Sequence, residues 1–487
     1  MFIDTTSTEL NDDLNEDDIA AYEKLIEVED KIKENKYEIL DYLYDTIVNY
    51  IDNYMLQIYR ETFESDIKTN VYYELFLTLE NMYSISLSEY EELYTPDDLI
   101  AQSIKLIYSK YMPPRNYTYT FVRDVCVDRD SIETKLTKIL AKEQPDQRTK
   151  EWYMFRYNHI TASNAWKCFE SESLKNSIIY QKCIPLNFDD NNSEKSDYVN
   201  VNSPLHWGHK YEPLSILIYE TVYDTKIEEF GCIEHDDYPF LAASPDGINV
   251  KKENPRYGRM LEIKNIVNRD IVQNPKKEYW VQMQLQMEVT NLNECDFLET
   301  RFKEYDNEDE YSSDGEEYLS IDKKRKGKIL LFYDNQRPLY EYYIPEIHQS
   351  YEEWEEIQFN NHKDHMFMKT IYWKLDEFSC ILVLRNKKWF EVAIEYIRNT
   401  WNMILNDRVN GYEHRAPKKR VRKDSFSLTE KKCFIQIEKH TSIGDIDNDD
   451  NGNGNDNGND GNNDNDNVLN IDTTNNDSNN DSNNTPP

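Results

Sequence analysis

The sequence lacks three features that would each indicate a different class of protein. It has no apolar run of about 18 residues, so no membrane-spanning helix is expected. Its first residues, Met1–Thr5, lack the basic segment leading into an apolar stretch that marks a secretory signal. None of its seven cysteines belongs to a C-x-x-C pair. These absences predict a reduced intracellular protein without a disulfide framework or a structural zinc site.

Positive charge is also scarce, which is unusual for a protein that binds nucleic acid. The 487 residues carry a formal net charge of −37, of which residues 1–110 contribute −18 and residues 444–487 contribute −11. The −8 that remains for residues 111–443 falls largely on one acidic stretch, Asp306–Glu317. The rest of the middle is close to neutral. The overall charge therefore does not exclude a nucleic-acid substrate.

Composition and periodicity divide most of the chain into four regions. Residues 1–115 are acidic, carry apolar residues at helical spacing, and are predicted to form a helical accessory region. Residues 145–345 alternate helical and strand patterns and contain all the candidate chemistry, with 306–328 predicted as a long exposed insertion. Residues 346–412 are predicted to form a C-terminal helical extension. Residues 413–487 combine a basic run with an Asn/Asp-rich tail.

The last region has two parts with different expectations. Six Lys and Arg residues lie within 415–423 and suit a nuclear localisation signal, a non-specific DNA contact or a solubilising linker. Residues 444–487 are Asn/Asp/Gly low complexity and are predicted to be disordered, since they cannot bury enough apolar surface to offset the entropy of ordering.

Two acids and a lysine form the sharpest pattern in the chain. Leu241–Ser244 is predicted to be a strand that ends just before Asp246, and Met260–Ile266 is predicted to be a second strand. Side chains alternate along a strand, so Glu262 and Lys264 share one face. Pairing of the two strands as a hairpin would place Asp246 beside Glu262.

Such an arrangement suits a divalent cation. The carboxylates of Asp246 and Glu262 would repel each other, and Mg²⁺ prefers a few carboxylate oxygens together with water and phosphate. A bound Mg²⁺ can activate water and stabilise charge on phosphate oxygens. The Lys264 ammonium could orient that water or neutralise charge in the transition state. Gly247 is expected to let the backbone turn tightly after Asp246.

A candidate phosphate site precedes this core. Trp152 and Arg156 are four residues apart and share a helical face. Ser163 is predicted to cap the next helix, and a helix N-terminus beside an arginine is suited to phosphate. The alternative is that Ser163 acts only as a cap and Arg156 only as a surface ion-pair residue.

Two further helices offer polar groups to the same centre. Gly208 and Glu212 share a helical face, and Glu212 could reach a metal across the gap that the glycine leaves, or could simply favour the helix dipole. Gln282 and Gln286 also share a face. Their amides could hydrogen-bond the lysine, a metal-bound water or a phosphate, although an ordinary amphipathic helix would carry the same pattern.

In order, these motifs resemble the lambda-exonuclease/YqaJ-like viral recombinase family of the PD-(D/E)XK nuclease superfamily. The resemblance covers about residues 147–300, and more loosely extends to 345. It rests on W-x3-R with I-T-A-S (152–163), G-x3-E (208–212), S-P-D-G (244–247), L-E-I-K (261–264) and Y-x2-Q-x-Q (279–284). It implies a restriction-endonuclease-like α/β core, a mixed sheet flanked by helices.

The resemblance also assigns roles to particular residues. By it, the metal ligands are the side chains of Asp246, Glu262 and Glu212 and the carbonyl of Ile263, and the cofactor is Mg²⁺ or Mn²⁺. Lys264 would position or activate the water. The resemblance also assigns Gln282 as support for the lysine. It assigns Arg156 and Ser163 as ligands of a terminal 5′ phosphate.

The implied activity is hydrolysis of phosphodiester bonds from duplex DNA ends in the 5′→3′ direction, in viral-type recombination, repair or replication. A single-strand annealing protein and further copies of the chain are partners that the resemblance allows. The expected compartment is the host cytoplasm or nucleus. The alternatives are a structure-specific endonuclease on the same core and a catalytically inactive DNA-binding scaffold. Intact Asp246, Glu262 and Lys264 argue against the inactive scaffold.

Overall fold

The computed structural model describes residues 16–93, 97–124, 126–188, 201, 203–334, 337–345, 347–348 and 350–417. The predicted disordered tail lies outside these residues. So does the basic run, apart from its first three positions.

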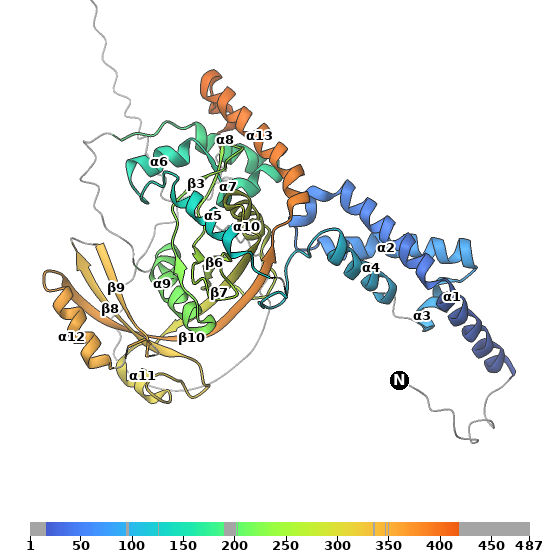
Figure 1. Ribbon diagram of the computed structural model, residues 1–487, viewed down its shortest axis with the longest axis horizontal. Coiled ribbons are helices and arrows are strands. Elements are labelled where there is room, and N and C mark those ends of the chain that lie inside the picture. The colour runs from blue at the N-terminus through green and yellow to red at the C-terminus, as the bar shows by residue number, and fades with distance from the viewer. Residues whose placement is uncertain are drawn as a thin grey trace, which may run out of the picture. The chain divides into compact units, whose positions relative to one another are not determined.

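The N-terminal region is helical, as its apolar spacing predicted. It consists of α1 (Glu16–Asn53), η1 (Met55–Tyr59), α2 (Phe63–Tyr83), α3 (Leu87–Leu93) and α4 (Asp97–Lys110). Four apolar residues at steps of four along α1 are each 1 % exposed or less: Ile39, Leu43, Ile47 and Ile51. This buried stripe packs α1 against α2, α3 and α4, which are coloured blue in Figure 1.

The remaining elements alternate helices with strands. In chain order they are α5 (Arg129–Leu140), α6 (Lys150–Tyr157), β1 (Ile160–Thr161), α7 (Ala162–Ala165), η2 (Trp166–Phe169), α8 (Glu172–Cys183), α9 (Pro204–Tyr223), β2 (Ile227–Glu228), β3 (Ile233–Glu234), β4 (Leu241–Ala243), β5 (Gly247–Asn249), β6 (Met260–Asn265), α10 (Lys277–Thr290), β7 (Glu294–Glu304), α11 (Glu308–Ser313), β8 (Lys326–Asp334), β9 (Arg337–Tyr343), α12 (Tyr351–Asn361), β10 (Met366–Leu384), α13 (Lys387–Asn410) and η4 (Glu413–Arg415).

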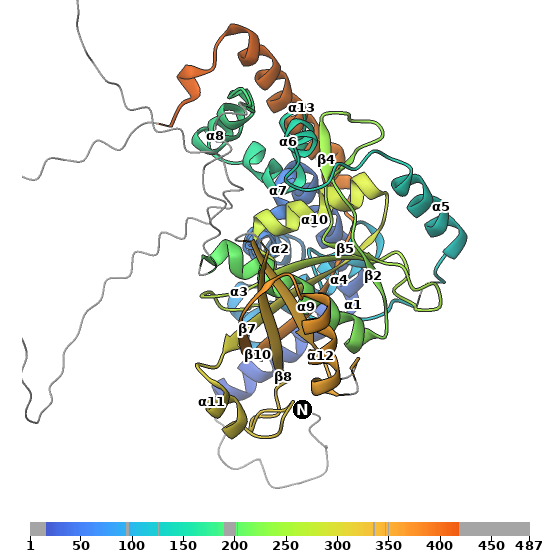
Figure 2. The same ribbon diagram turned by 90° about the vertical axis from the view of Figure 1, so that its left-hand side faces the viewer.

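The strands form two sheets. The larger sheet is mixed, with the order β2-β5-β6-β7-β10-β8-β9, in which only the β6–β7 pair is parallel. Figure 2 shows its long strands β7, β10 and β8 running close together. The smaller sheet has the order β1-β4-β3. A mixed sheet flanked by helices is the α/β fold class that the motifs predicted.

Helices cover both faces of the larger sheet at β6. Leu261 and Ile263 belong to the apolar cluster that α9 buries against β7. On the other face, Met260 packs in the cluster that includes the apolar residues of α10. The alternation of the strand therefore directs Glu262 and Lys264 toward α10, on the side opposite Leu261 and Ile263. The predicted orientation of the two sets of side chains is confirmed, but the prediction of a half-buried strand is wrong, because both faces of β6 are covered.

The prediction that residues 346–412 are helical is wrong in the middle of that range. β10 is a 19-residue strand that pairs with β7 on one side and β8 on the other. Ile371, Trp373 and Leu375 are buried and alternate with less buried neighbours, which is the period-two pattern of a strand. The sheet therefore extends past residue 345, and only α12 and α13 match the prediction.

The acidic insertion is also more ordered than the predicted exposed loop. It contains α11, and its Tyr311 is only 2 % exposed. The buried Lys326 ammonium donates to the carbonyls of Tyr311 and Asp314 at 2.6 and 2.8 Å. Buried amine-to-carbonyl bonds of this kind fold part of the insertion back onto β8.

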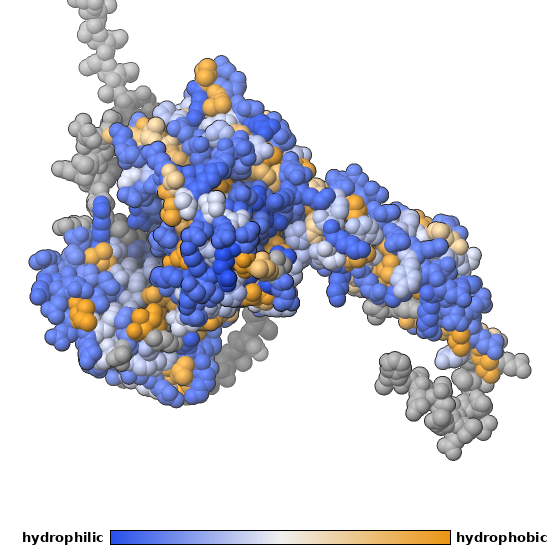
Figure 3. Space-filling view, in the orientation of Figure 1, coloured by the Kyte–Doolittle hydropathy of each residue, from blue (hydrophilic) through white to orange (hydrophobic). Residues whose placement is uncertain are grey.

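The sequence predicted that the protein has no disulfide framework and no membrane-spanning helix, and the described residues bear on both predictions. Six of the cysteines lie among them, and all six are free thiols. Within the same ranges, no helix has both the length and the apolar character needed to cross a bilayer. The face drawn in Figure 3 is largely hydrophilic, with scattered hydrophobic residues.

Candidate active site

Asp246 and Glu262 lie opposite each other across two paired strands. β5 runs antiparallel to β6 with Gly247 opposite Leu261, and one further step in this register places Asp246 opposite Glu262. Asp246 Oδ2 accepts a hydrogen bond of 2.7 Å from the backbone N–H of Ile263. The expected neighbourhood of the two acids is confirmed. The strand that creates it is the one after Asp246, because the preceding strand β4 belongs to the smaller sheet.

Gly247 has a different role from the predicted turn. It is not among the glycines with positive φ in the described part of the chain. A Cβ at this position would lie 2.2 Å from Ile227 Cγ2 and 3.4 Å from the carbonyl oxygen of Glu228. The glycine therefore allows β2 to approach β5 closely, which holds the strand that begins just after Asp246.

Glu262 is fully buried and its two oxygens have different partners. Oε2 accepts a hydrogen bond of 2.7 Å from Gln286 Nε2, which also donates to the carbonyl of Ser244 at 3.0 Å. Oε1 lies 2.8 Å from Lys264 Nζ. This second contact is an attraction of charges, because no hydrogen-bond donor is aligned with the buried Oε1. One oxygen of Glu262 is therefore held in place while the other lacks an aligned donor.

The pKa values of the cluster reflect three carboxyls and one ammonium in a buried space. Burial and repulsion by Glu262 and Glu212 raise the pKa of Asp246 well above its usual range. Burial raises the pKa of Glu212 to about 7, with Lys264 opposing the shift and Glu262 adding to it. Burial by itself would lower the pKa of Lys264, but attraction to Glu262 and Asp246 outweighs it and the pKa rises. The single ammonium of Lys264 therefore offsets only part of the negative charge that the three carboxyls would carry.

α9 carries Glu212 into this electrostatic group. Its N-terminus is capped by Ser203, whose hydroxyl accepts from the N–H of His206 at 3.1 Å. The carbonyl of Gly208 accepts a hydrogen bond of 3.2 Å from Asn265 at the end of β6. A Cβ on Gly208 would meet no atom within 4 Å, so open space lies beside this turn of the helix. This agrees with the gap predicted between Gly208 and Glu212.

The two glutamines of α10 differ in their contacts. Gln286 is buried and joins Glu262 to Ser244, as described above. Gln282, the residue predicted to support the lysine, is half-buried and has no hydrogen bond among the described residues. The sequence placed both on one face, but it gave no signal that Gln286 would be the one to bind the carboxylate.

The candidate phosphate residues lie beside the smaller sheet. The guanidinium of Arg156 in α6 stacks over the Trp152 ring at 4.6 Å, as their four-residue spacing predicted. Ser163 lies inside α7 and is not its cap, since the capping position is Thr161. The Ser163 hydroxyl lies 3.5 Å from that of Thr161. β1, which links α6 to α7, pairs with β4, the strand that leads toward Asp246.

The acids do not form a complete metal-ligand set by themselves. Among the described residues, no group of three or more His, Cys, Asp or Glu side chains gathers in a way that could hold an ion. Ligation at this centre would therefore need backbone carbonyls, water or phosphate besides Asp246 and Glu262. Mg²⁺ commonly has such a mixed ligand set.

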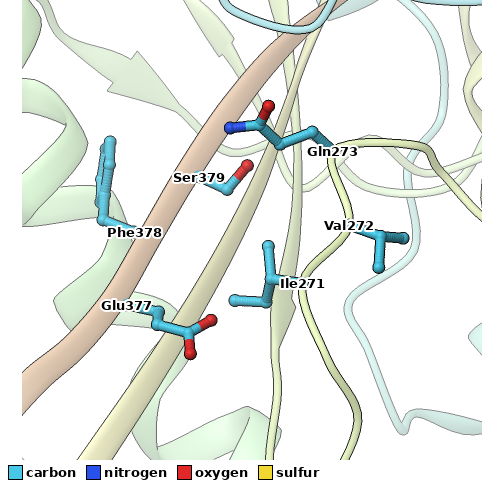
Figure 4. A pocket seen from close by; sticks show the side chains of 6 residues that line it. All are labelled: Ile271, Val272, Gln273, Glu377, Phe378 and Ser379. Atoms are coloured by element: carbon cyan, nitrogen blue, oxygen red, sulfur yellow. The ribbon is translucent and has the colours of Figure 1, made fainter.

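A groove of about 320 Å³ lies on β10 two strands away from Lys264. Figure 4 shows Ser379 and Glu377 on the strand, facing Ile271 and Gln273 of the segment that follows β6. Lys264 pairs with Glu299 and Glu299 pairs with Ser379, so these three residues form one row across the sheet. The groove therefore opens on the same face as the lysine.

An acid before β5, followed by Glu-x-Lys on the paired strand of a mixed α/β sheet, is the arrangement expected from the resemblance to PD-(D/E)XK nuclease cores. Comparison with known families agrees: residues 151–293 match the YqaJ-like viral recombinase domain. Over these residues the chain is similar to this family, as the resemblance of its motifs predicted.

The comparisons also found individual proteins of low sequence identity. An uncharacterized protein of Acanthamoeba polyphaga mimivirus is 29 % identical over 310 residues, a match that covers 56 % of this chain and 55 % of the viral protein. The chain thus spans about half the length of that relative. The solved alkaline exonuclease LHK-Exo of Laribacter hongkongensis is 14 % identical with a TM-score of 0.32, and covers 55 % of this chain and 97 % of its own. Its complex with dAMP gives 15 % identity, a TM-score of 0.31 and the same coverage.

Proposed function

We propose that this protein is a Mg²⁺-dependent deoxyribonuclease that degrades linear duplex DNA from its ends, in the 5′→3′ direction. The observation that carries the proposal is the placement of Asp246 opposite Glu262, with Lys264 Nζ 2.8 Å from Oε1 of Glu262. This arrangement lies within a YqaJ-like viral recombinase domain. The biological setting that follows is viral-type DNA recombination, repair or replication.

The residues of the site fit Mg²⁺. Oε1 of Glu262 is buried without an aligned hydrogen-bond donor, and the pKa of Asp246 is raised well above normal by burial and by its neighbours. Both features indicate carboxylates whose negative charge Lys264 offsets only in part, and a hard divalent cation would supply the remaining positive charge. We propose Asp246, Glu262 and the carbonyl of Ile263 as ligands. Glu212, which does not gather with these two acids among the described residues, would join them once the cation is bound. When bound, the cation would polarise the phosphate and lower the pKa of water.

The other side chains of the site have separate proposed roles. Gln286 holds Glu262 through Oε2 and leaves Oε1 available. Lys264 would orient the attacking water or neutralise charge that develops on the scissile phosphate, since its ammonium is the cation beside Oε1 of Glu262. Gln282 would donate to the lysine-bound water or the phosphate once DNA is present. Each group acts from a strand or helix that is buried on its other side.

A preference for ends would come from a separate phosphate site. Arg156, held by its stacking on Trp152, and Ser163 in α7 are proposed to bind the 5′ phosphate of the terminal nucleotide. Arginine can bind phosphate through two parallel hydrogen bonds, which fixes orientation as well as affinity. A single-strand annealing protein that takes up the 3′ strand, and further copies of this chain, are proposed partners.

The proposal is tested with matched DNA substrates. A linear duplex labelled at its 5′ or 3′ end and a closed circle of the same sequence are incubated with Mg²⁺ and with excess chelator. The proposal predicts early release of the 5′ label as a mononucleotide from the linear duplex, an intact circle, and no reaction in chelator. Early release of the 3′ label would indicate degradation in the 3′→5′ direction instead. Linearisation of the circle would favour the endonuclease alternative, and equal activity in chelator would exclude the metal.

A further inference from the structure

The aromatic ring of Tyr279 lies close to two cationic side chains, Lys264 and Arg269. Tyr279 is in the first turn of α10, and the residue is 6 % exposed. Lys264 Nζ lies 4.9 Å from the ring centroid, and the guanidinium carbon of Arg269 lies 5.7 Å from it. A cation within about 6 Å of an aromatic face is attracted by the ring quadrupole. The ring is therefore a second anchor for Lys264, besides the carboxylate of Glu262.

Arg269 is the second cation near the Tyr279 ring. It lies in the segment between β6 and α10, and its guanidinium forms an ion pair with the buried Glu299 of β7. Its backbone carbonyl accepts from Arg301, which in turn pairs with Glu377 at 2.5 Å. Because Glu299 is also the cross-strand partner of Lys264, its charge offsets the repulsion between the two cations.

A lysine side chain needs such restraint to act in catalysis. Its ammonium is a compact charge on a flexible four-carbon stem, and about 24 % of the Lys264 side chain is exposed. The ammonium contacts Oε1 of Glu262, and attraction to the Tyr279 ring is a second restraint on its position.

We propose that Tyr279 is a positioning residue that holds the Lys264 ammonium between Glu262 and the phosphate, and that Arg269 and Glu299 keep the ring in place. This inference rests on the proposed nuclease function and adds a residue to it. It requires the face of an aromatic ring at position 279, and it does not require the hydroxyl.

The test compares Tyr279→Phe with Tyr279→Leu in the full chain. Tyr279→Phe keeps the ring, so cleavage of a 5′-phosphorylated duplex should stay within about threefold of the parent. Tyr279→Leu removes it, and kcat should fall roughly tenfold, the size of one desolvated cation–π contact, with KM and calorimetric Mg²⁺ binding unchanged. The matched control is Tyr351→Leu, which removes a contact of 3.9 Å with Lys328 Nζ between α12 and β8 and should leave kcat unchanged.

A readout without activity separates this inference from the proposed function. With ε-¹³C-labelled lysine, the Lys264 signal is assigned by its loss in Lys264→Arg. The ring current should shift it upfield in the parent and in Tyr279→Phe, but not in Tyr279→Leu. Normal shifts in the parent, equal kcat losses in both variants, or parental kcat in Tyr279→Leu would overturn the inference. A shifted signal in a protein that cuts no DNA would overturn the proposed function instead.

Discussion

Replacing Lys264 by alanine should separate metal binding from cleavage. The ammonium lies 2.8 Å from Glu262 Oε1 and competes with any cation for that oxygen. Lys264→Ala removes this competitor and leaves both carboxylates, so Mg²⁺ should bind at least as tightly as in the parent. The same change removes the group proposed to stabilise charge on the phosphate. Cleavage should therefore fall on the order of 10²–10³-fold, as is typical for losing one such group.

The contact also gives the expected effect on stability. Two unit charges 2.8 Å apart attract by about 6 kcal/mol at an effective dielectric constant near 20, before desolvation is counted. Removing one partner of a buried pair costs about 3–5 kcal/mol, and proton uptake by the remaining Glu262 lowers this cost. In chelator, Lys264→Ala should therefore melt below the parent. Mg²⁺ should raise its Tm by more than that of the parent, because it replaces the missing positive charge.

Three measurements on one preparation check this prediction. They are calorimetric titration with Mg²⁺, thermal unfolding with and without Mg²⁺, and a time course on 5′-phosphorylated linear duplex. Lys374→Ala is the control, because Lys374 pairs with Asp314 at 2.9 Å near a different end of the sheet. The reasoning is refuted if Lys264→Ala cuts DNA at the parent rate, or if it loses Mg²⁺ binding.

Three other variants probe residues around the centre. Arg156→Ala should reduce the preference for a 5′-phosphorylated over a 5′-hydroxyl duplex while leaving Mg²⁺ affinity unchanged, and a parent without such a preference would contradict the phosphate site. Gly247→Ala should lower the free energy of unfolding by about 1–3 kcal/mol in a urea titration, because its Cβ would meet Ile227, and Ile227→Ala in the same chain should recover part of the loss. Gln282→Ala should slow cleavage with Mg²⁺ binding retained, and parental rates would remove Gln282 from the site.

The local chemistry of the site could be predicted because it depends on short-range order. Strand alternation placed Glu262 and Lys264 on one face and Leu261 on the other, and the structure agrees. The partner strand of Asp246 was misassigned because β5 has only three residues, too few for a periodic signal. The contact between Gln286 and Glu262 was not predicted, because it depends on how α10 sits on the sheet and not on spacing within α10.

The errors in the fold have similar physical causes. Residues 379–384 of β10 are all buried, so exposure does not alternate along them, and the strand lies between two helical segments. Periodicity alone cannot distinguish such a run from a buried helix. The role of Gly247 depends on Ile227, twenty residues earlier in the chain. A contact of that kind leaves no trace in the local sequence.

The most direct test of the central claim is the Mg²⁺ dependence of Glu262→Gln. The substitution keeps the shape of the side chain and removes the charge at the oxygen nearest Lys264. Glu288→Gln is the control, since Glu288 is also a buried acid but pairs with Arg385. We predict that Glu262→Gln shows no calorimetric Mg²⁺ binding and no release of nucleotides from linear duplex, while Glu288→Gln keeps both. Normal Mg²⁺ binding together with parental cleavage by Glu262→Gln would contradict the account.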